Sequence, residues 1–537
     1  MLKLSENKAI ELANLAIKSG FYLKRSYAVK LDLAKQMREE LCINCTGEAM
    51  LEHLTATKPV IKKAPKPAKD LKPSFTGTAL AKERNRGILQ GNKFLITYAQ
   101  NETAVNLPFF HNLRAYADHI GAQLLVVKGH YNTTAFSGQC KGDSEIYAAE
   151  LHPYLVDADQ FLGYYQGIFL NAETNILPTT QYPVNAGGAL IGNSEAIILG
   201  HTKQQAKTLP VMKGELARWV YSTGAVTVRN YVTSAAGAKA EADHAYGALL
   251  VEVCSESLQW CARHLRADEL TGSFYDLNLF VDKCTISVSD KPFSMVLGDV
   301  HAEKLDPVFW GQTLAFIDQH KPQKVVLHDI LDFSSRNHHR RDSGHFLASQ
   351  IGRTVEDDLI TVSETLVQLR NIVDYGDLIV VYSNHDDALI RWLDCNKYDP
   401  RKDPINAVTY HKLNAAVYAD IINKEPERPI LETALAELQL DSAQATFLLL
   451  DQSCSVNGVE VGFHGDKGVN GSKGSPMLYS KQGISMVTGH THSPSMIGDV
   501  TTVGCCNLEQ GYNVGMSSWA LCHAIIYPNG HKTLITL

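Results

Sequence analysis

Five apolar stretches in the second half of the chain are each followed closely by His, Asp or Asn. The first is Met295-Val-Leu-Gly298, which precedes Asp299 and His301. Its apolar residues predict a buried strand, and Gly298 lets the chain turn so that Asp299 and His301 project together from the strand's end. A carboxylate and an imidazole placed in this way are a suitable pair of ligands for a divalent metal ion.

The four later stretches repeat this arrangement. Their predicted strands are 324–327, 378–382, 459–463 and 484–487, and the polar residues that follow are Asp329, Asn384, His464, His490 and His492. In a layered α/β fold the carboxyl ends of strands lie along one edge, so residues distant in sequence can share one site there. With Asp299 and His301 the ligands number seven, which is more than one ion needs. Two adjacent ions that share a bridging carboxylate would use them all.

The chemistry of such a pair of ions points to phosphoester hydrolysis. Two neighbouring metals clamp a phosphoryl group, lower the pKa of a bridging water to give hydroxide near neutral pH, and stabilise the charge of an in-line transition state. A mixed shell of His, Asp and Asn suits Mn²⁺, with Fe, Zn²⁺ and Mg²⁺ as alternatives.

The length of 537 residues predicts more than one domain. We predict a helical element at 1–55, a basic linker rich in Pro and Lys at 56–91, a smaller α/β accessory domain at 92–288 and a catalytic α/β domain at 289–537. The accessory domain opens with a strand, a helix and a strand at 94–98, 107–120 and 123–127, and further strands are predicted at 196–199, 225–228 and 248–253. In the catalytic domain we predict helices from Asp306-Pro307, along 355–373 and within 404–440, and a terminal hairpin around 528–530.

Composition narrows the functional class. A net charge of −7 argues against a protein coated in basic surface for nucleic acid, although a local basic groove stays compatible with it. No segment approaches the roughly 18 uninterrupted apolar residues of a membrane helix. The N-terminus shows no hydrophobic secretory segment, so we expect a cytoplasmic protein without a membrane partner.

The motifs as a series resemble a known superfamily. The order Asp299-x-His301, Asp329-x-x-Asp332, Asn384-His385-Asp386, His464 and Gly489-His490-Thr491-His492 is similar to that of the calcineurin-like metallophosphoesterases, over roughly residues 291–537. The resemblance implies a four-layer αββα sandwich. It also implies that Asp299, His301, Asp329 and His492 hold one metal, and that Asp329, as the bridge, holds the other with Asn384, His464 and His490. His385 would protonate the leaving oxygen. His328 and Ser383 stand where the superfamily usually has Gly, so a side chain there would crowd the turn or contact the substrate.

A narrower likeness rests on shorter motifs. Residues 94–101, 222–228 and 272–277, joined to this esterase half, resemble the large metallophosphoesterase proteins of tailed bacteriophages. That group includes the early nuclease with which some phages degrade host DNA. The likeness implies a metal-dependent DNase in the cytoplasm of the infected bacterium.

A basic loop follows the predicted bridging aspartate. In Arg336-Asn-His338-His339-Arg340-Arg341 we expect Arg336, His338 and His339 to contact the phosphates of DNA. We interpret the N-terminal helices as a cap or an oligomerisation element and expect a homo-oligomer. Two alternatives stay open: a small-molecule phosphodiesterase or phosphatase with the same two metals, and a DNA-binding regulator with a non-catalytic esterase half.

Overall fold

The computed structural model describes residues 86–131, 146–336, 343–373, 376–394, 398–511 and 513–537, with a few residues of the N-terminal segment, at 34–36, 39, 46, 49, 50 and 54. The chain divides into two compact units, Met1–Arg84 and Asn85–Leu537. Apart from those few residues, the predicted helical element and most of the predicted linker lie outside the described residues. The second unit begins before residue 92, because β1 (Ile88–Leu89) already pairs with β5 (Gln160–Leu162).

A six-stranded sheet carries the first three of the five sequence motifs. Its order is β18 (Thr446–Phe447), β17 (Asp377–Val380), β16 (Lys324–Leu327), β15 (Ser294–Val296), β24 (His523–Ile526) and β25 (Lys532–Ile535). Strands β15 to β18 run parallel, and the terminal hairpin β24–β25 joins antiparallel to β15. The first three strand ends therefore point to the same edge of one sheet.

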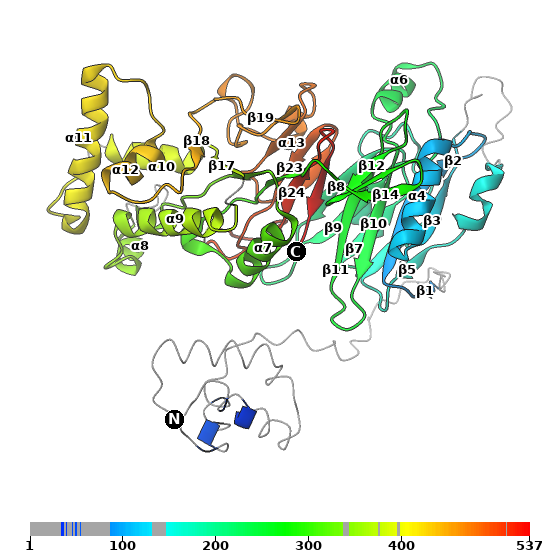
Figure 1. The fold of residues 1–537 in the computed structure, drawn as a ribbon, viewed down its shortest axis with the longest axis horizontal. Coiled ribbons are helices and arrows are strands. Elements are labelled where there is room, and N and C mark those ends of the chain that lie inside the picture. The colour runs from blue at the N-terminus through cyan, green and yellow to red at the C-terminus, as the bar shows by residue number, and fades with distance from the viewer. Residues whose placement is uncertain are drawn as a thin grey trace, which may run out of the picture. The chain divides into compact units, whose positions relative to one another are not determined.

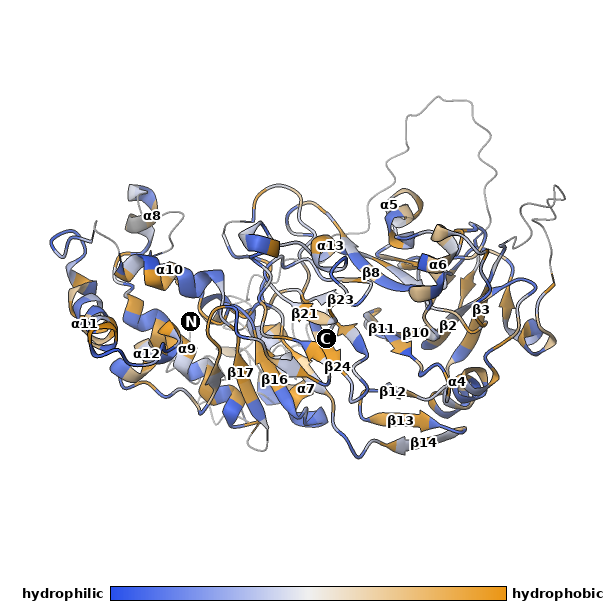
Figure 2. Ribbon diagram, turned by 90° about the horizontal axis from the view of Figure 1, so that it is seen from above, coloured by the Kyte–Doolittle hydropathy of each residue, from blue (hydrophilic) through white to orange (hydrophobic). Residues whose placement is uncertain are grey.

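Both faces of this sheet are buried, as apolar runs without alternation predict. Met295 and Val325 pack on the helices, whereas Val296 and Val326 pack against a second sheet. Figure 2 shows the hydrophobic colouring of β16, β17 and β24. The helices of this half are α7 (Pro307–His320), α8 (Gly344–Ser349), α9 (Val355–Arg370), α10 (Asn384–Leu393), α11 (Ala407–Asn423), α12 (Ile430–Glu437) and α13 (Pro476–Tyr479).

Local sequence explains where these helices begin. The Asp306 carboxylate accepts hydrogen bonds from Val308 N and Phe309 N, both at 2.9 Å, and Pro307 occupies the first turn. Thr354 begins α9 with a reciprocal capping box. The predicted apolar stripe is completely buried: Val355, Leu359, Val362, Leu366 and Leu369 lie on α9, and Val373 follows the end of this helix.

The second sheet has eleven strands and continues through both halves of the unit. Its order is β1, β5, β6 (Ile168–Asn171), β7 (Ala196–Leu199), β9 (Arg218–Thr223), β8 (Gln204–Leu209), β22 (Ser495–Ile497), β23 (Val500–Thr502), β21 (Met486–Thr488), β20 (Val459–Glu460) and β19 (Ser455–Val456). The joint is the antiparallel pairing of β22 with β8. Strands from both sides of the predicted boundary at 288/289 therefore share one hydrogen-bonded sheet.

Within the described residues, the remainder of the unit holds two smaller sheets and three α-helices. Several of these elements are labelled in Figure 1. One sheet has the order β11 (Trp260–Arg266), β10 (Gly247–Val253), β2 (Lys93–Gln100), β3 (Gln123–Gly129) and β4 (Leu155–Val156), and the other joins β12 (Phe274–Asp276), β13 (Leu279–Asp282) and β14 (Thr285–Val288). The helices are α4 (Leu107–Ile120), α5 (Gly187–Leu190) and α6 (Ala235–Ala242). Strands β2 and β3 are parallel and flank α4 in sequence, so the expected strand–helix–strand opening is confirmed.

One predicted strand is wrong. Residues 225–228 form only isolated bridges, from Ala225 to Tyr98 and Tyr246 and from Thr227 to Val105. The strand lies just before them as β9, and Gly224, with φ +85°, ends it. The predicted mixed α/β architecture is otherwise confirmed. Within the described ranges, no helix is both long and apolar enough to span a membrane.

The shared sheet predicts that residues 289–537 do not form a stable protein by themselves. A chain of residues 289–537 would leave the β22 edge unpaired and uncover the face of β25 that β11 packs on. We expect this fragment to aggregate and to unfold at a lower temperature than the full chain, measured by size-exclusion chromatography and circular dichroism. A monomeric fragment with the melting temperature of the full chain would contradict the prediction.

Candidate metal centre

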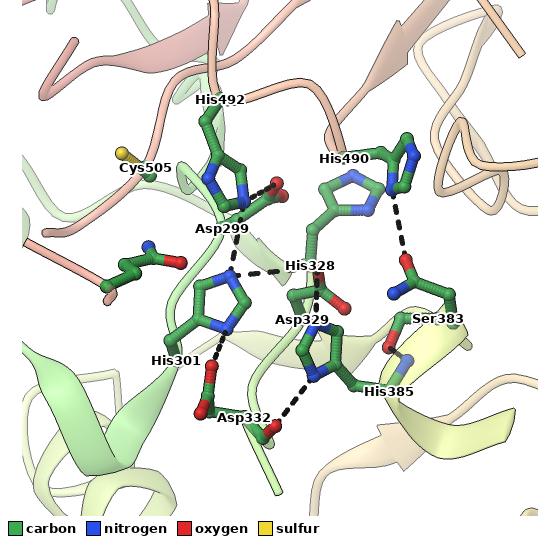
Figure 3. A network of polar contacts seen from close by, with 12 residues as sticks. Asp299, His301, His328, Asp329, Asp332, Ser383, His385, His490, His492 and Cys505 are labelled. Carbon is green, nitrogen blue, oxygen red and sulfur yellow. Dashed lines mark hydrogen bonds and ion pairs between the residues drawn. The ribbon is translucent and has the colours of Figure 1, made fainter. Parts of the chain in front are cut away.

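The structure brings all seven predicted ligands together at one edge of the packed sheets. Figure 3 labels Asp299, His301, Asp329, His490 and His492 among them. Asp299 and His301 follow β15, Asp329 follows β16, Asn384 begins α10 after β17, His464 follows β20, and His490 and His492 follow β21. They therefore come from three parallel strands of one sheet and two strands of the sheet packed against it.

Four of these residues form a first group. The possible ligand atoms of Asp299, His301, Asp329 and His492 all lie within 4.8 Å of one another, and all four side chains are buried. His492 Nε2 lies 3.0 Å from Asp299 Oδ2 and 3.2 Å from His301 Nε2. Such a cluster of imidazoles and carboxylates could hold a divalent metal ion.

A second group lies on the other side of Asp329. His464 Nε2 is 3.2 Å from Asp329 Oδ2 and 3.2 Å from Asn384 Oδ1, and His490 Nδ1 is 3.0 Å from the same Asn384 oxygen. Asp329 Oδ2 also lies 3.8 Å from His301 Nε2 in the first group. The carboxylate of Asp329 thus stands between the two groups, where the sequence predicts a bridge.

Two candidate ligands, Asp299 and Asp329, have buried carboxylate oxygens without a hydrogen-bond donor among the described residues. Oδ1 of Asp299 and Oδ1 of Asp329 are both inaccessible to solvent and unpartnered within the described part of the chain. An unsatisfied buried carboxylate oxygen is costly, and a cation beside it removes the cost. These atoms fit a metal centre, and the donor set suits Mn²⁺, Fe or Zn²⁺.

The pKa values of Asp329 and His464 without metal indicate a site that stabilises a positive charge beside the carboxylates. Burial would raise the pKa of Asp329, but the charges of His464, His385 and His301 outweigh it and hold that pKa well below its usual range. Burial would likewise lower the pKa of His464, yet Asp329 and Asp299 raise it to about 9. Each group therefore favours the charged form of the other.

The backbone at the site is strained. Four candidate ligands adopt the left-handed conformation, with φ of 47° at His301, 46° at Asp329, 71° at His490 and 56° at His492. Each such residue costs about 1–3 kcal/mol and persists only where its surroundings enforce it. Here the enforcing contacts include His301 N to Asp329 O at 2.8 Å and Ala520 N to His492 O at 3.1 Å.

A contact with the backbone carbonyl of Asp332 orients the His385 ring toward the cluster. Its Nδ1 lies 2.7 Å from Asp332 O, and because a carbonyl only accepts, Nδ1 carries the proton. Nε2 then lies on the side of Asp329, 4.0 Å from Oδ2. A protonated Nε2 at this place can donate to an oxygen bound between the two groups.

A second layer of charges, which the ligand pattern did not single out, holds the loop after β16. Asp332 Oδ1 lies 3.1 Å from His301 Nδ1, and Lys304 Nζ lies 2.7 Å from Asp332 Oδ2. The half-buried Glu303 carboxylate accepts hydrogen bonds from Asp332 N and Phe333 N at 2.8 and 2.9 Å. A carboxylate on the outer nitrogen of a ligand histidine fixes its ring and its tautomer. The spacing Asp329-x-x-Asp332 was the sequence signal for this role.

The two side chains that stand where the superfamily has glycine have structural contacts. His328 is fully buried, so it contacts no substrate, and its Nδ1 lies 3.4 Å from His464 Nδ1. Burial and the charge of His464 lower the pKa of His328 to about 4, so it is neutral. Ser383 caps α10, accepting from His385 N at 3.2 Å.

Arg336 differs from the expected phosphate contact. Its side chain is 9 % exposed and forms two hydrogen bonds with Asp403, at 2.8 and 2.5 Å. Arg336 therefore connects two segments of the protein instead of facing the solvent. The sequence did not reveal this because Asp403 lies 67 residues further on. His338 and His339, with the rest of the basic loop, lie outside the described residues.

A cavity of about 500 Å³ opens over the cluster. Asp329, His385, His490 and His492 lie on its wall, with cationic side chains from Lys304 and Arg353 and aromatic rings from Phe346 and Trp519. None of the last four was predicted from the sequence, because each reaches the cavity through tertiary packing.

Comparison with known proteins gives one extensive match. The chain is 39% identical over 551 aligned residues to Protein A1 of Escherichia phage T5, and the alignment covers 99% of this chain and 98% of that protein. This chain belongs to the Protein A1 family. It is thus related to a phage protein along nearly its whole length, and the predicted likeness to phage proteins is confirmed to that extent. No family model and no solved structure matches the chain.

The close approach at Gly489 gives a direct test of the centre. A Cβ at Gly489 would lie 2.1 Å from Asp299 Oδ1. We therefore expect Gly489→Ala to displace the Asp299 carboxylate and to lower the bound metal at least tenfold, measured by elemental analysis after incubation with Mn²⁺ and desalting.

The matched control is Gly311→Ala in α7, where an added Cβ meets nothing within 4 Å. This variant should bind metal like the natural chain and should be at least as stable, because alanine favours the helix over glycine. Full metal content in a folded Gly489→Ala protein would show that Asp299 is not a ligand.

Proposed function

We propose that this chain is a phosphodiesterase of the calcineurin-like metallophosphoesterase type, and that its substrate is DNA. One observation carries the proposal: seven side chains from five strand ends meet around the unpartnered oxygens of Asp299 and Asp329, beneath a cavity. The order of these motifs and the two packed sheets support the superfamily's sandwich as the architecture of this half.

The reaction follows from the positions of the side chains. Two divalent ions, preferably Mn²⁺, would supply Lewis acidity toward the phosphoryl oxygens and activate the attacking water. Asp299, His301, Asp329 and His492 would hold one ion. Asp329, Asn384, His464 and His490 would hold the other.

The remaining groups act on the substrate. His385 Nε2 faces the same space as Asp329 Oδ2 and would donate a proton to the leaving oxygen, while the Asp332 carbonyl keeps the ring in place. Lys304 and Arg353 place positive charge on the cavity wall, where phosphates beside the scissile one would lie. Phosphate contacts of this kind position a strand without reading its sequence.

The relationship to a phage protein supports a place in the host bacterium's cytoplasm for this activity. A cavity of about 500 Å³ also admits a small diester, so a small-molecule phosphodiesterase is the second candidate. A DNA-binding regulator has no comparable support, since its expected binding segment, the N-terminal helices and the linker, lies almost wholly outside the described residues.

The deciding experiment is incubation of the purified full-length protein with linear and circular DNA, with Mn²⁺ and with a chelator. We expect the DNA to be degraded with Mn²⁺ and to stay intact with the chelator. Gel electrophoresis measures the amount of intact DNA. DNA that stays intact while a small model phosphodiester is hydrolysed rapidly would overturn the proposal and favour the second candidate.

Two substitutions separate metal binding from proton transfer. His385→Ala should keep its metal and lose at least a hundredfold in turnover, since general acid catalysis contributes about 10²–10⁴-fold. Asp329→Asn should lose both metal and turnover, because the carboxylate stands between the two groups. Metal content by elemental analysis and DNA hydrolysis rates are compared for both variants.

The controls are His411→Ala on the exposed face of α11 and Asp318→Asn, whose side chain is 65 % exposed. Both should match the natural protein in metal content and in rate. Equal loss of metal in His385→Ala and Asp329→Asn would show that His385 is a ligand and not the acid.

A further inference from the structure

Trp519 lies directly beside the metal cluster. Its ring centroid is 4.3 Å from that of His492, with the ring planes at 69°, and its half-buried indole forms part of the cavity wall. The next residue, Ala520, donates its N–H to His492 O at 3.1 Å. The indole is therefore fixed relative to one candidate ligand by both ring contact and backbone.

The cavity wall also contains a second aromatic ring, that of Phe346, and the cationic side chain of Arg353. Phe346 of α8 lines the cavity and is 8 % exposed. The Arg353 side chain is 44 % exposed, and its Nη2 lies 3.4 Å from Asp358 Oδ1. Arg336 Nη1 donates to the Arg353 carbonyl at 3.4 Å, so the buried Arg336–Asp403 pair supports the backbone from which this cation projects.

These features match one chemical class of ligand. A cavity of about 500 Å³ lies within the size range of small-ligand sites, which a nucleotide fits and a duplex does not. An aromatic ring beside the reacting centre suits the face of a nucleobase, and a cation on the same wall suits a neighbouring phosphate. Four candidate ligands line the cavity, namely Asp329, Asn384, His490 and His492, so the scissile phosphate must enter it.

We propose that Trp519 is the stacking platform for the nucleobase next to the scissile phosphate, and that the strand is cut while locally unpaired. A base stacked on an indole cannot also remain paired inside a duplex, so the substrate is single-stranded DNA or an opened end. This inference rests on the proposed function and deepens it by naming the form of the substrate.

The test compares two single-stranded oligonucleotides with the same phosphodiester backbone. One is oligothymidylate, and in the other tetrahydrofuran abasic units replace the nucleosides. Trp519→Ala should lower kcat/KM for oligothymidylate roughly 5- to 100-fold, mainly through KM, because stacking contributes about that much per base. On the abasic oligonucleotide, which has no base to stack, the rate of the Trp519→Ala variant should stay within about twofold of the rate of the natural protein.

Three measurements make the result specific. Trp519→Phe should recover most of the loss, because it restores an aromatic face. Metal content should be the same in the natural protein and in both variants. The control is Trp260→Ala, which removes a half-buried tryptophan that does not line the cavity, and it should leave both rates unchanged.

Equal losses on the two oligonucleotides, or loss of metal in Trp519→Ala, would show that Trp519 only buttresses His492 and would overturn the inference while the proposed DNase activity stands. A natural protein that cuts blunt, fully paired duplex faster than oligothymidylate would also overturn it. Failure of the natural protein to cut any DNA would overturn the proposed function and this inference together.

Discussion

The carboxylate of Asp329 is the group on which the site depends. It is buried at the end of a central strand, where an isolated charge is unfavourable, and it remains ionised because histidines surround it. Its Oδ2 lies within 4.0 Å of nitrogens from His301, His385 and His464, which belong to three different strand ends. The attraction of one anion for these separate elements draws the edges of two sheets together.

The fold sustains this concentration of charge through rigidity around it. Two of the strained residues, Asp329 and His301, are joined by a backbone hydrogen bond of 2.8 Å that continues the pairing of β15 with β16 beyond the strands themselves. Glu303, Asp332 and Lys304 then hold the loop that follows. Strain of this kind is tolerable because apolar residues of the six-stranded sheet are buried on both faces.

The sequence was sufficient for elements whose signals are local. Strand β16 has the bounds that its apolar run predicts, and α7 begins after Asp306 as the cap predicts. The convergence of seven polar residues could be predicted because each follows a strand, and strand ends share an edge. The pairing of β22 with β8 could not be predicted, because nearly 300 residues separate the two strands and the sequence of neither strand identifies the other as its partner. The contact of Arg336 with Asp403 and the place of Trp519 beside His492 could not be predicted for the same reason.

The continuous eleven-stranded sheet has a consequence for how such proteins diversify. Strand β22 begins three residues after His492, and its partner β8 belongs to the first half of the unit. Recombination that exchanged one half for a foreign one would have to reproduce both the edge of β8 and the register that fixes the His492 loop. The shared sheet therefore disfavours exchange of one half alone, in keeping with an alignment to the phage T5 protein that runs nearly the length of both chains.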